Sequence, residues 1–347
     1  MLTFYNPDHA LHHGRHEMFR GQWVPCVEVP ARQDLVLAEL QKRRMGPLRL
    51  PLTAPSDALS AVHAPGYLAF LKSAWSDWLA LDPANAQRDV LPSVWPGPGG
   101  RRDIEPANFS ARLGQFAMDA GSPLTAGTWA AARAGADCAV SAALAVLQGQ
   151  RAAFALTRPP GHHASAASFG GYCFLNNAAI AVQQLRRGGF DRVAVVDVDY
   201  HHGNGTQDIF YQRADVLVAS IHGDPMTEYP FFSGHADERG ADAGLGCNLN
   251  IPLPAGTGFE AWLGALQQAL AAVKDFAAQA MVVSLGVDTY AGDPISGFKL
   301  ESSDYLQIGQ ALAGAGLPTV FVFEGGYAVA EVGLNTVNVL AGFQSAA

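Results

Sequence analysis

Cysteine is scarce in this sequence and has no pattern that would give it a structural role. The four cysteines, Cys26, Cys138, Cys173 and Cys247, form no Cys-x-x-Cys pair. A disulfide framework or a cysteine-type zinc site is therefore not expected, and reduced thiols of a cytoplasmic protein are the simplest interpretation. Ligands for any metal must be sought among histidine and carboxylate side chains.

An excess of basic charge and long apolar runs are lacking as well. The chain has 22 basic against 31 acidic residues and a formal net charge of -9, which argues against a nucleic-acid-binding surface. No uninterrupted apolar run approaches the roughly 18 residues of a transmembrane helix, and the first residues do not resemble a signal peptide. We expect a cytoplasmic protein with neither nucleic acid nor membrane as a partner.

The chain does contain many apolar residues in short, regularly placed runs. Hydrophobic residues make up 49% of its 347 positions and charged residues 15%, which is enough for a sizeable core. The runs predict strands buried on both faces, as in a parallel sheet, at residues 152–156, 192–198, 216–221, 249–253, 281–287 and 319–323. Helical patterns lie before or between most of them, at residues 128–148, 176–187, 257–276, 304–313 and 331–343. This alternation predicts an α/β fold with three layers, a central, mainly parallel sheet with helices on both faces.

The remaining chain is less regular. The N-terminal quarter shows only weak helical patterning, around residues 33–44 and 58–75. Residues 81–125 are rich in proline and glycine and predict a long irregular loop, and such loops in compact domains are usually lids or binding loops. Because predicted elements of one sheet flank this loop, we expect a single domain spanning residues 1–347.

The most informative segment is a predicted strand that leads directly into Asp197-Val198-Asp199-Tyr200-His201. Alternate residues of an extended chain share one face, so Asp197, Asp199 and His201 are expected to point the same way. Asp199 and His201 follow the strand at its carboxyl end, where open α/β sheets bind ligands. A carboxylate beside an imidazole there suits a divalent metal. The alternative is a carboxylate that caps a loop or helix, next to a histidine that is merely packed.

A further carboxylate, Asp288, ends the predicted strand at residues 281–287 in the same way. Together with Asp199 and His201 it would provide three protein ligands and leave a coordination position open, as catalytic zinc sites do. A helix N-cap would explain Asp288 equally well when it is considered alone.

Two adjacent histidines, His162 and His163, follow the predicted strand 152–156 on the stiff sequence Arg-Pro-Pro-Gly. Imidazole titrates near neutrality, so the pair suits a proton-transfer site. A solvated histidine pair is the alternative, and this is what we expect of His12 and His13, which no strand precedes.

Two glycine-containing segments complete the set of motifs. After the strand 319–323, Glu-Gly-Gly-Tyr could place the Tyr327 hydroxyl over a site as a hydrogen-bond donor to a developing negative charge. The segment Phe-Gly-Gly-Tyr-Cys-Phe-Leu-Asn-Asn, residues 169–177, could line an apolar slot. Ordinary packing against turns is the alternative for both.

Taken together, these motifs resemble those of the histone deacetylase superfamily, and within it the bacterial acetylpolyamine amidohydrolases. Arg-Pro-Pro-Gly-His-His, Gly-Gly-Tyr-Cys-Phe-Leu-Asn-Asn-Ala, Asp-Val-Asp-Tyr-His-His-Gly-Asn-Gly-Thr-Gln, Ser-Leu-Gly-Val-Asp and Glu-Gly-Gly-Tyr occur in the order of the family. The similarity covers nearly all of residues 150–343 and is thinner before them. It implies a zinc hydrolase with an arginase-like fold.

The resemblance implies roles for individual residues. Asp199, His201 and Asp288 would hold one Zn²⁺ per chain, although the same donors also suit Fe²⁺ or Co²⁺. His162 and His163 would be the tandem catalytic histidines, with His163 acting as general base and then as general acid.

Further residues would support these. Tyr327 would polarise the scissile carbonyl and stabilise the oxyanion. Tyr172 would line the acyl tunnel, with Gly171 and Phe232 in the same substrate site. In the surrounding layer, the resemblance implies that Asp197 orients His162 and helps to hold a structural K⁺ with Ser220, and that Asn204 partners His163.

The implied function is removal of acetyl groups from small acetylated amines, above all acetylpolyamines such as N-acetylputrescine and N-acetylcadaverine. The family's long loop narrows the site, often within a homodimer, and carries acidic residues that meet the distal ammonium of the substrate. At the matching positions this chain has Ser110 and Gly121. The acidic residues Asp103, Glu105, Asp119 and Glu228 either replace the lost ones or, for those on the loop, are solvated surface groups.

Three other functions remain open. The runner-up is deacylation of acetyl-lysine peptides or of other acylated amines. An arginase-type ureohydrolase shares the fold but needs two metals and more bridging carboxylates than this sequence offers. A non-catalytic protein that binds acetylated amines is the third.

Overall fold

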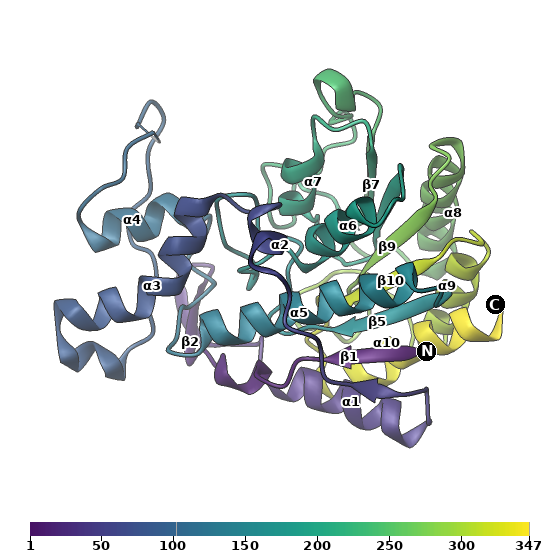
Figure 1. Ribbon diagram of the computed structural model, residues 1–347, viewed down its shortest axis with the longest axis horizontal. Coiled ribbons are helices and arrows are strands. Elements are labelled where there is room, and N and C mark those ends of the chain that lie inside the picture. The colour runs from purple at the N-terminus through teal and green to yellow at the C-terminus, as the bar shows by residue number, and fades with distance from the viewer. Residues whose placement is uncertain (102, 347) are drawn as a thin grey trace.

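One eight-stranded sheet forms the centre of the computed structural model, which describes residues 1–101 and 103–346 (Figure 1). The strands lie in the order β4-β1-β5-β10-β9-β6-β7-β8, and every neighbouring pair is parallel. The strands are β1 (Leu2–Tyr5), β4 (Leu48–Arg49), β5 (Ala152–Leu156), β6 (Val193–Asp197), β7 (Val216–Gly223), β8 (Asn248–Leu253), β9 (Ala280–Leu285) and β10 (Thr319–Phe323).

Helices cover both faces of this sheet, because alternate strand residues point to opposite sides. Val195 and Val282 pack in one cluster with α2 (Ser56–Ser60), α3 (Pro65–Leu81), α5 (Thr128–Leu147) and α6 (Asn177–Arg187). Val196 and Val283 pack in the other with α1 (Ala31–Lys42), α8 (Phe259–Asp275), α9 (Asp304–Ala313) and α10 (Val329–Ser345). The predicted three-layer α/β fold is confirmed.

The predicted elements after residue 125 are all present. Strands β5 and β10 and helix α9 have the predicted bounds, and the other elements differ by a few residues at their ends. The short helix α7 (Asn204–Phe210) was not predicted, and begins directly after the histidine motif. Local pattern sufficed here because most of these strands are apolar runs that are buried along their length, although the edge strand β8 is only partly buried.

The N-terminal quarter contributes more to the sheet than its weak pattern predicted. Strands β1 and β4 extend the sheet beyond β5, and β2 (His16–Phe19) pairs with β3 (Gln22–Pro25) in a separate antiparallel hairpin. The single helical stretch expected at residues 58–75 is two helices, because Pro65 begins a new one at its first position.

The segment 81–125 is not irregular throughout, which corrects the prediction of a plain loop. It contains the 3-10 helix η2 (Pro83–Gln87) and the helix α4 (Phe109–Phe116), whose N-cap Asn108 accepts from the backbone NH of Ala111. Its two ends are joined by backbone hydrogen bonds between Val90 and Leu124. The segment projects from the body of the protein next to α3, as the left part of Figure 1 shows.

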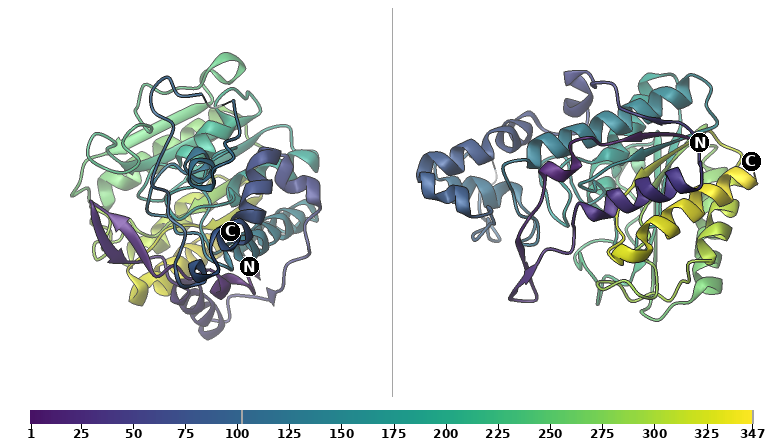
Figure 2. Two further views of the ribbon diagram at one scale, coloured as in Figure 1. Left: turned by 90° about the vertical axis from the view of Figure 1, so that its left-hand side faces the viewer. Right: turned by 90° about the horizontal axis from the view of Figure 1, so that it is seen from below.

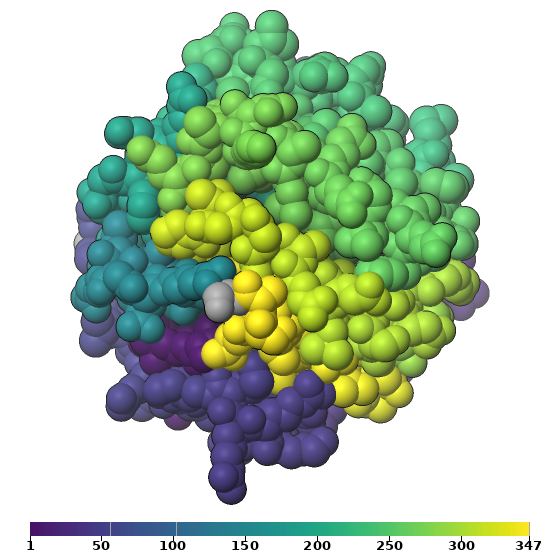
Figure 3. Space-filling view, turned by 90° about the vertical axis from the view of Figure 1, so that its right-hand side faces the viewer, coloured from purple at the N-terminus to yellow at the C-terminus, as the bar shows by residue number. Residues whose placement is uncertain are grey.

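The candidate site lies at the carboxyl ends of the strands, on the side of the sheet from which segment 81–125 projects. The N-terminus is at the right in Figure 1, so β1 and the strands parallel to it run toward the left, and Figure 2 (left) looks onto their carboxyl ends. Figure 3 shows the opposite face, where N-terminal segments (purple) lie against C-terminal ones (yellow).

Among the described residues, α5 is the helix whose length and apolar composition would allow it to cross a membrane. Its apolar window is 72% buried inside the protein, as expected of a core helix. The four cysteines are free thiols.

Candidate active site

Four neighbouring strands supply the candidate site from their carboxyl ends. Strands β5, β10, β9 and β6 lie side by side in the sheet, and each is followed by predicted site residues. These are His162 and His163 after β5, Tyr327 after β10, Asp288 after β9, and Asp199 and His201 after β6. Parallel strands bring segments that are more than 100 residues apart to a single edge.

Asp199, His201 and Asp288 converge as a set of metal-ligand side chains. One donor atom from each lies within 4.8 Å of the others, and all three residues are buried. His201 Nδ1 is 3.0 Å from Asp288 Oδ2 and 3.4 Å from Asp199 Oδ1. Backbone NH groups of Gly325 and Tyr200 donate to the carboxylates of Asp199 and Asp288, which fixes both side chains. Asp288 caps no helix, so the N-cap alternative is not realised.

The charges of this trio favour a divalent cation. Burial raises the pKa of Asp288 to about 7, and the negative charge of Asp199 adds to the effect. Burial also opposes ionisation of Asp199, but His162 and His201 hold its pKa far below the usual range. Two carboxylates this close resist joint ionisation unless positive charge is supplied between them. The two carboxylates and the imidazole therefore fit the predicted metal in donor type and in charge.

The tandem histidines have different partners and different charge states. His162 Nδ1 lies 3.0 Å from Asp197 Oδ2, and although burial opposes the charged form, Asp199 and Asp197 raise the pKa of His162 to about 10. His163 Nδ1 lies 2.7 Å from Asn204 Oδ1. Burial, together with the charges of His162 and His201, lowers the pKa of His163 well below its usual value. His163 is thus the neutral ring, suited to accept a proton.

Tyr327 is held by contacts on both its backbone and its ring. Its NH donates to Asp293 Oδ2 at 2.6 Å, and the Arg32 guanidinium lies over its ring at 4.7 Å. Gly325 comes so close to the metal-ligand trio that a Cβ there would lie 2.4 Å from Asp199 Oδ2. Burial raises the pKa of Tyr327 well above 10, so its hydroxyl keeps its proton for donation.

A cavity of about 610 Å³ opens onto these groups. His163, His201 and Tyr327 line its inner part, together with the predicted substrate residues Gly171 and Tyr172. The Tyr172 ring meets that of Tyr327 edge-on at 5.5 Å. The volume and the mixed lining suit a small organic substrate.

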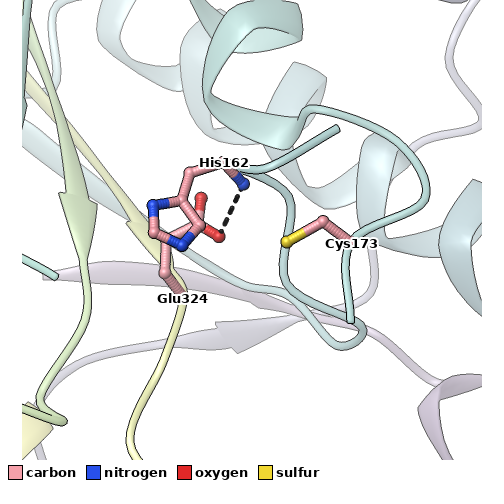
Figure 4. Close-up of side chains that lie close together, drawn as sticks. All are labelled: His162, Cys173 and Glu324. Carbon is pink, nitrogen blue, oxygen red and sulfur yellow. Dashed lines mark hydrogen bonds between the residues drawn. The ribbon is translucent and has the colours of Figure 1, made fainter. Parts of the chain in front are cut away.

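A second cluster of possible ligands consists of Cys173, Glu324 and His162, which is itself one of the tandem histidines (Figure 4). Glu324 Oε2 accepts from the backbone NH groups of Gly161 and His162, the latter bond being the dashed line in Figure 4. Burial raises the pKa of Glu324 to about 8 and that of the Cys173 thiol well above 9. The raised pKa values favour the neutral forms of both groups, so the cluster supports the histidine loop and is a poor cation site.

The layer around the trio includes the residues expected to hold potassium. Asp197 and Ser220 lie in register between β6 and β7, and both are buried. Asp197 Oδ1 accepts from the backbone NH of Asp199, and Ser220 Oγ is 2.8 Å from His222 Nδ1. The two residues are therefore cross-strand neighbours in the sheet.

The structure corrects the expectation for His12 and adds detail for two other residues. His12 is not solvated, because it is buried with Nδ1 2.9 Å from Thr128 Oγ1, while His13 is exposed. Phe232 lines the cavity, and its side chain is 93% exposed. Asp119 is not a solvated acid either, since its Oδ2 accepts from Gly171 and Tyr229.

The two other loop acids remain at the surface. Asp103 forms an exposed ion pair with Arg101, and Glu105 is exposed and does not line the cavity. Glu228, by contrast, lies half-buried in the cavity wall.

Sequence reasoning missed several cavity residues. Glu17, from β2, is 2% exposed, and its Oε1 accepts from the Tyr172 hydroxyl at 3.0 Å. Met118 and Tyr229 also line the cavity, from two loops that carry no recognisable motif. Nothing local marks these residues, because a hairpin or loop reveals its buried face only through contacts with distant segments.

Comparisons with known proteins agree with this geometry. A family model described as the histone deacetylase domain matches residues 26–343. The chain is 52% identical to acetylpolyamine amidohydrolase 2 of Pseudomonas aeruginosa, with 99% of each chain covered. It is 50% identical to acetylpolyamine amidohydrolase 1 of the same organism, with 100% of each covered. The crystal structure of acetylpolyamine aminohydrolase from Burkholderia pseudomallei superposes with a TM-score of 0.94 at 39% identity, covering 100% of this chain and 99% of that one.

Proposed function

The chain belongs to the histone deacetylase family and is an amidohydrolase, and from this premise we propose that it deacetylates small acetylated amines, above all acetylpolyamines. The observation that carries the chemistry is the convergence of the Asp199–His201–Asp288 trio, His163 and Tyr327 on one cavity. The amine class is supported by full-length similarity to proteins named acetylpolyamine amidohydrolases. N-acetylputrescine and N-acetylcadaverine are the substrates we propose.

Asp199, His201 and Asp288 would hold one divalent ion per chain, with Zn²⁺ as our proposal and Fe²⁺ or Co²⁺ as alternatives for the same donors. When bound, such an ion supplies Lewis-acid activation of water and of the amide carbonyl. The trio's position in the cavity, with His201 at its wall, brings this chemistry to the substrate.

His163 is the proton carrier in this proposal. The amide oxygen of Asn204 can only accept, so His163 Nδ1 carries the hydrogen and Nε2 has the free lone pair. Nε2 takes a proton from the attacking water and then returns it to the nitrogen of the leaving amine. His162, kept cationic by Asp197 and Asp199, stabilises the negative charge that develops nearby.

Tyr327 donates its hydroxyl proton in a hydrogen bond to the carbonyl oxygen as negative charge develops there. A donor fixed in advance in a buried site stabilises such charge more than water can. Tyr172 and Gly171 would line the channel for the acyl-bearing chain. The products are acetate and the free amine.

Recognition of a cationic amine is supported by acidic side chains that face the cavity. Glu17 Oε2 is buried without a hydrogen-bond partner among the described residues, and Glu228 lies in the same wall. We assign the distal ammonium to these two in preference to Asp103 and Glu105, which lie outside the cavity lining. Salt bridges to a buried ammonium need such unsatisfied oxygens.

Three further parts of the proposal concern assembly and location. Phe232, at the cavity, and Trp95, on the projecting segment 81–125, are exposed aromatic residues. We propose that the second subunit of a homodimer covers them. A structural K⁺ would bind near Asp197 and Ser220. We place the single catalytic domain, residues 1–347, in the cytoplasm.

The test is acetate release from N-acetylputrescine, N-acetylcadaverine, an acetyl-lysine peptide and the uncharged analogue N-acetylbutylamine, each with Zn²⁺-loaded protein. We expect turnover of the two diamines with much lower KM than for N-acetylbutylamine. Glu17→Gln and Glu228→Gln should raise KM for the diamines and leave that for N-acetylbutylamine unchanged. Preference for the peptide would contradict the polyamine assignment, and hydrolysis of none of the four would contradict the proposed function.

A further inference from the structure

Two consecutive residues of the segment 81–125, Met118 and Asp119, contact groups on several sides of the His163 ring. Asp119 Oδ2 accepts from the backbone NH of Gly171 at 2.6 Å and from the Tyr229 hydroxyl at 2.6 Å. One carboxylate oxygen thus joins three separate loops across the cavity. Both donors belong to residues that pack directly on His163.

The contacts of Gly171 and Tyr229 leave little room for the imidazole to move. A Cβ on Gly171 would lie 2.2 Å from His163 Cδ2, so the backbone at this residue touches the ring. The Tyr229 ring stands edge-on to His163 at 5.1 Å and 85°. By holding Gly171 and Tyr229 together, Asp119 fixes two of the surfaces between which the ring of His163 lies.

Met118 acts on another side of the same ring. Its Sδ accepts from Asn204 Nδ2 at 3.5 Å, while Asn204 Oδ1 is the atom that faces His163 Nδ1 at 2.7 Å. A thioether sulfur has no proton to donate, so it favours the amide orientation that turns the oxygen toward His163. That orientation leaves the lone pair on Nε2.

Asp119 has no oxygen left for a substrate ammonium. Its Oδ1 accepts from the Gly121 NH at 2.9 Å and from Ser122 Oγ at 3.3 Å. Ser122 Oγ in turn accepts from the Tyr172 NH at 2.8 Å. Each carboxylate oxygen therefore already has two partners within the protein.

We propose that Met118 and Asp119 are positioning residues for the general base His163, and that Asp119 does not bind the substrate amine. This inference rests on the proposed function, because it concerns the orientation of a residue in that reaction. It assigns to the segment 81–125 a role in the chemical step, in addition to narrowing the cavity. A base displaced by a fraction of an ångström loses alignment with the attacking water, which lowers kcat.

The test measures kcat and KM of Asp119→Asn for N-acetylputrescine and for N-acetylbutylamine, which lacks the distal ammonium. We expect kcat to fall about 10-fold or more for both amides, with KM within about 2-fold of wild type. A rise in KM for the charged amide alone would show that Asp119 binds the ammonium and would overturn the inference. Unchanged kcat would overturn it as well.

Two milder variants keep the test decisive if Asp119→Asn folds poorly. Tyr229→Phe removes one of the two bonds to Oδ2, and Met118→Leu removes the sulfur at similar volume; both should lower kcat and leave KM unchanged for both amides. In the double variant with Asp119→Asn, Tyr229→Phe should lower kcat by less than it does alone, since the amide has already weakened the acceptor of the tyrosine hydroxyl. Full additivity would overturn the inference.

Glu105→Gln, on the same segment but exposed, is the matched control and should behave as wild type. Wild-type protein that hydrolyses neither amide would overturn the proposed function and this inference together. Normal wild-type turnover with unchanged kcat in all three variants would overturn the inference alone.

Discussion

His163 Nδ1 lies 2.7 Å from the side-chain oxygen of Asn204, whereas the preceding ring, His162, pairs with the carboxylate of Asp197 at 3.0 Å. The neutral amide lets His163 stay unprotonated beside the cationic ring of His162. The same loop therefore carries one charged imidazole, stabilised by Asp199 and Asp197, and one neutral imidazole, kept neutral chiefly by burial.

Replacing Asn204 by Asp should move the acidic limb of the pH profile of kcat/KM. A carboxylate stabilises the imidazolium and raises the pKa of His163, which burial and the neighbouring rings otherwise keep low. The base works only when unprotonated, so activity should be lost at a pH about one unit or more higher than in wild type. A pH-independent fall in activity would instead point to distorted geometry.

Replacing Asp288 by Ala should abolish both metal binding and hydrolysis. The variant removes one of three buried donors and leaves Asp199 and His201 as an incomplete site. Metal content, measured by mass spectrometry after loading with Zn²⁺, should drop from one ion per chain to a trace. The control variant Asp275→Asn, at the exposed end of α8, should still bind one ion per chain. Two manganese ions per wild-type chain would favour a ureohydrolase.

Replacing Tyr327 by Phe should lower kcat about 10²- to 10³-fold with little change in KM, because in the proposed mechanism the lost hydroxyl acts on charge that develops in the transition state. The ring contacts with Arg32 and Tyr172 do not need the hydroxyl, so thermal unfolding should stay close to wild type. A large rise in KM with unchanged kcat would show that Tyr327 only binds substrate.

Replacing Gly171 by Ala should inactivate the protein, both because the backbone is strained and because the new side chain clashes with His163. Its φ of +53° makes any side chain unfavourable by roughly 1–2 kcal/mol, and the new Cβ would also strike the His163 ring. Gly316 is the matched control, since it has a φ of +67° and no atom within 4 Å of an added Cβ. Gly316→Ala should lose stability but keep its kcat. Equal losses of kcat in the two variants would argue against the clash.

Replacing Glu17 by Gln should stabilise the protein at high pH and change little at low pH. Burial raises the pKa of Glu17 from its ordinary 4.5 to about 7, so the folded state binds the proton more tightly. The protonated Glu17 therefore contributes fully to the free energy of unfolding of the wild type below pH 4.5, and this contribution is lost as pH rises through 7. Thermal unfolding at pH 5 and pH 8 should show the variant gaining on wild type at pH 8. The same difference at both values would contradict the burial of a titrating Glu17.

Much of the site could be predicted because its residues follow continuous apolar runs. Asp199 and His201 share a face by the two-residue repeat of extended chain, and Asp288 and Tyr327 follow their strands at the same edge. These relations depend on local periodicity and on the common direction of parallel strands, both of which a sequence displays.

The tertiary structure alone decided what surrounds these groups. Strand β1 joins the sheet although its pattern is weak, because β5 offers an edge with free hydrogen-bonding groups, and β4 then pairs with the outer edge of β1. Contacts between distant segments likewise decide that His12 is buried, that Phe232 is exposed and that Asp119 is hydrogen-bonded within the protein. Each outcome depends on which distant segment a loop meets, and no local pattern encodes that contact. The sequence by itself thus determined the α/β fold and the chemical groups, while packing between distant loops determined how His163 is held and which acids face the cavity.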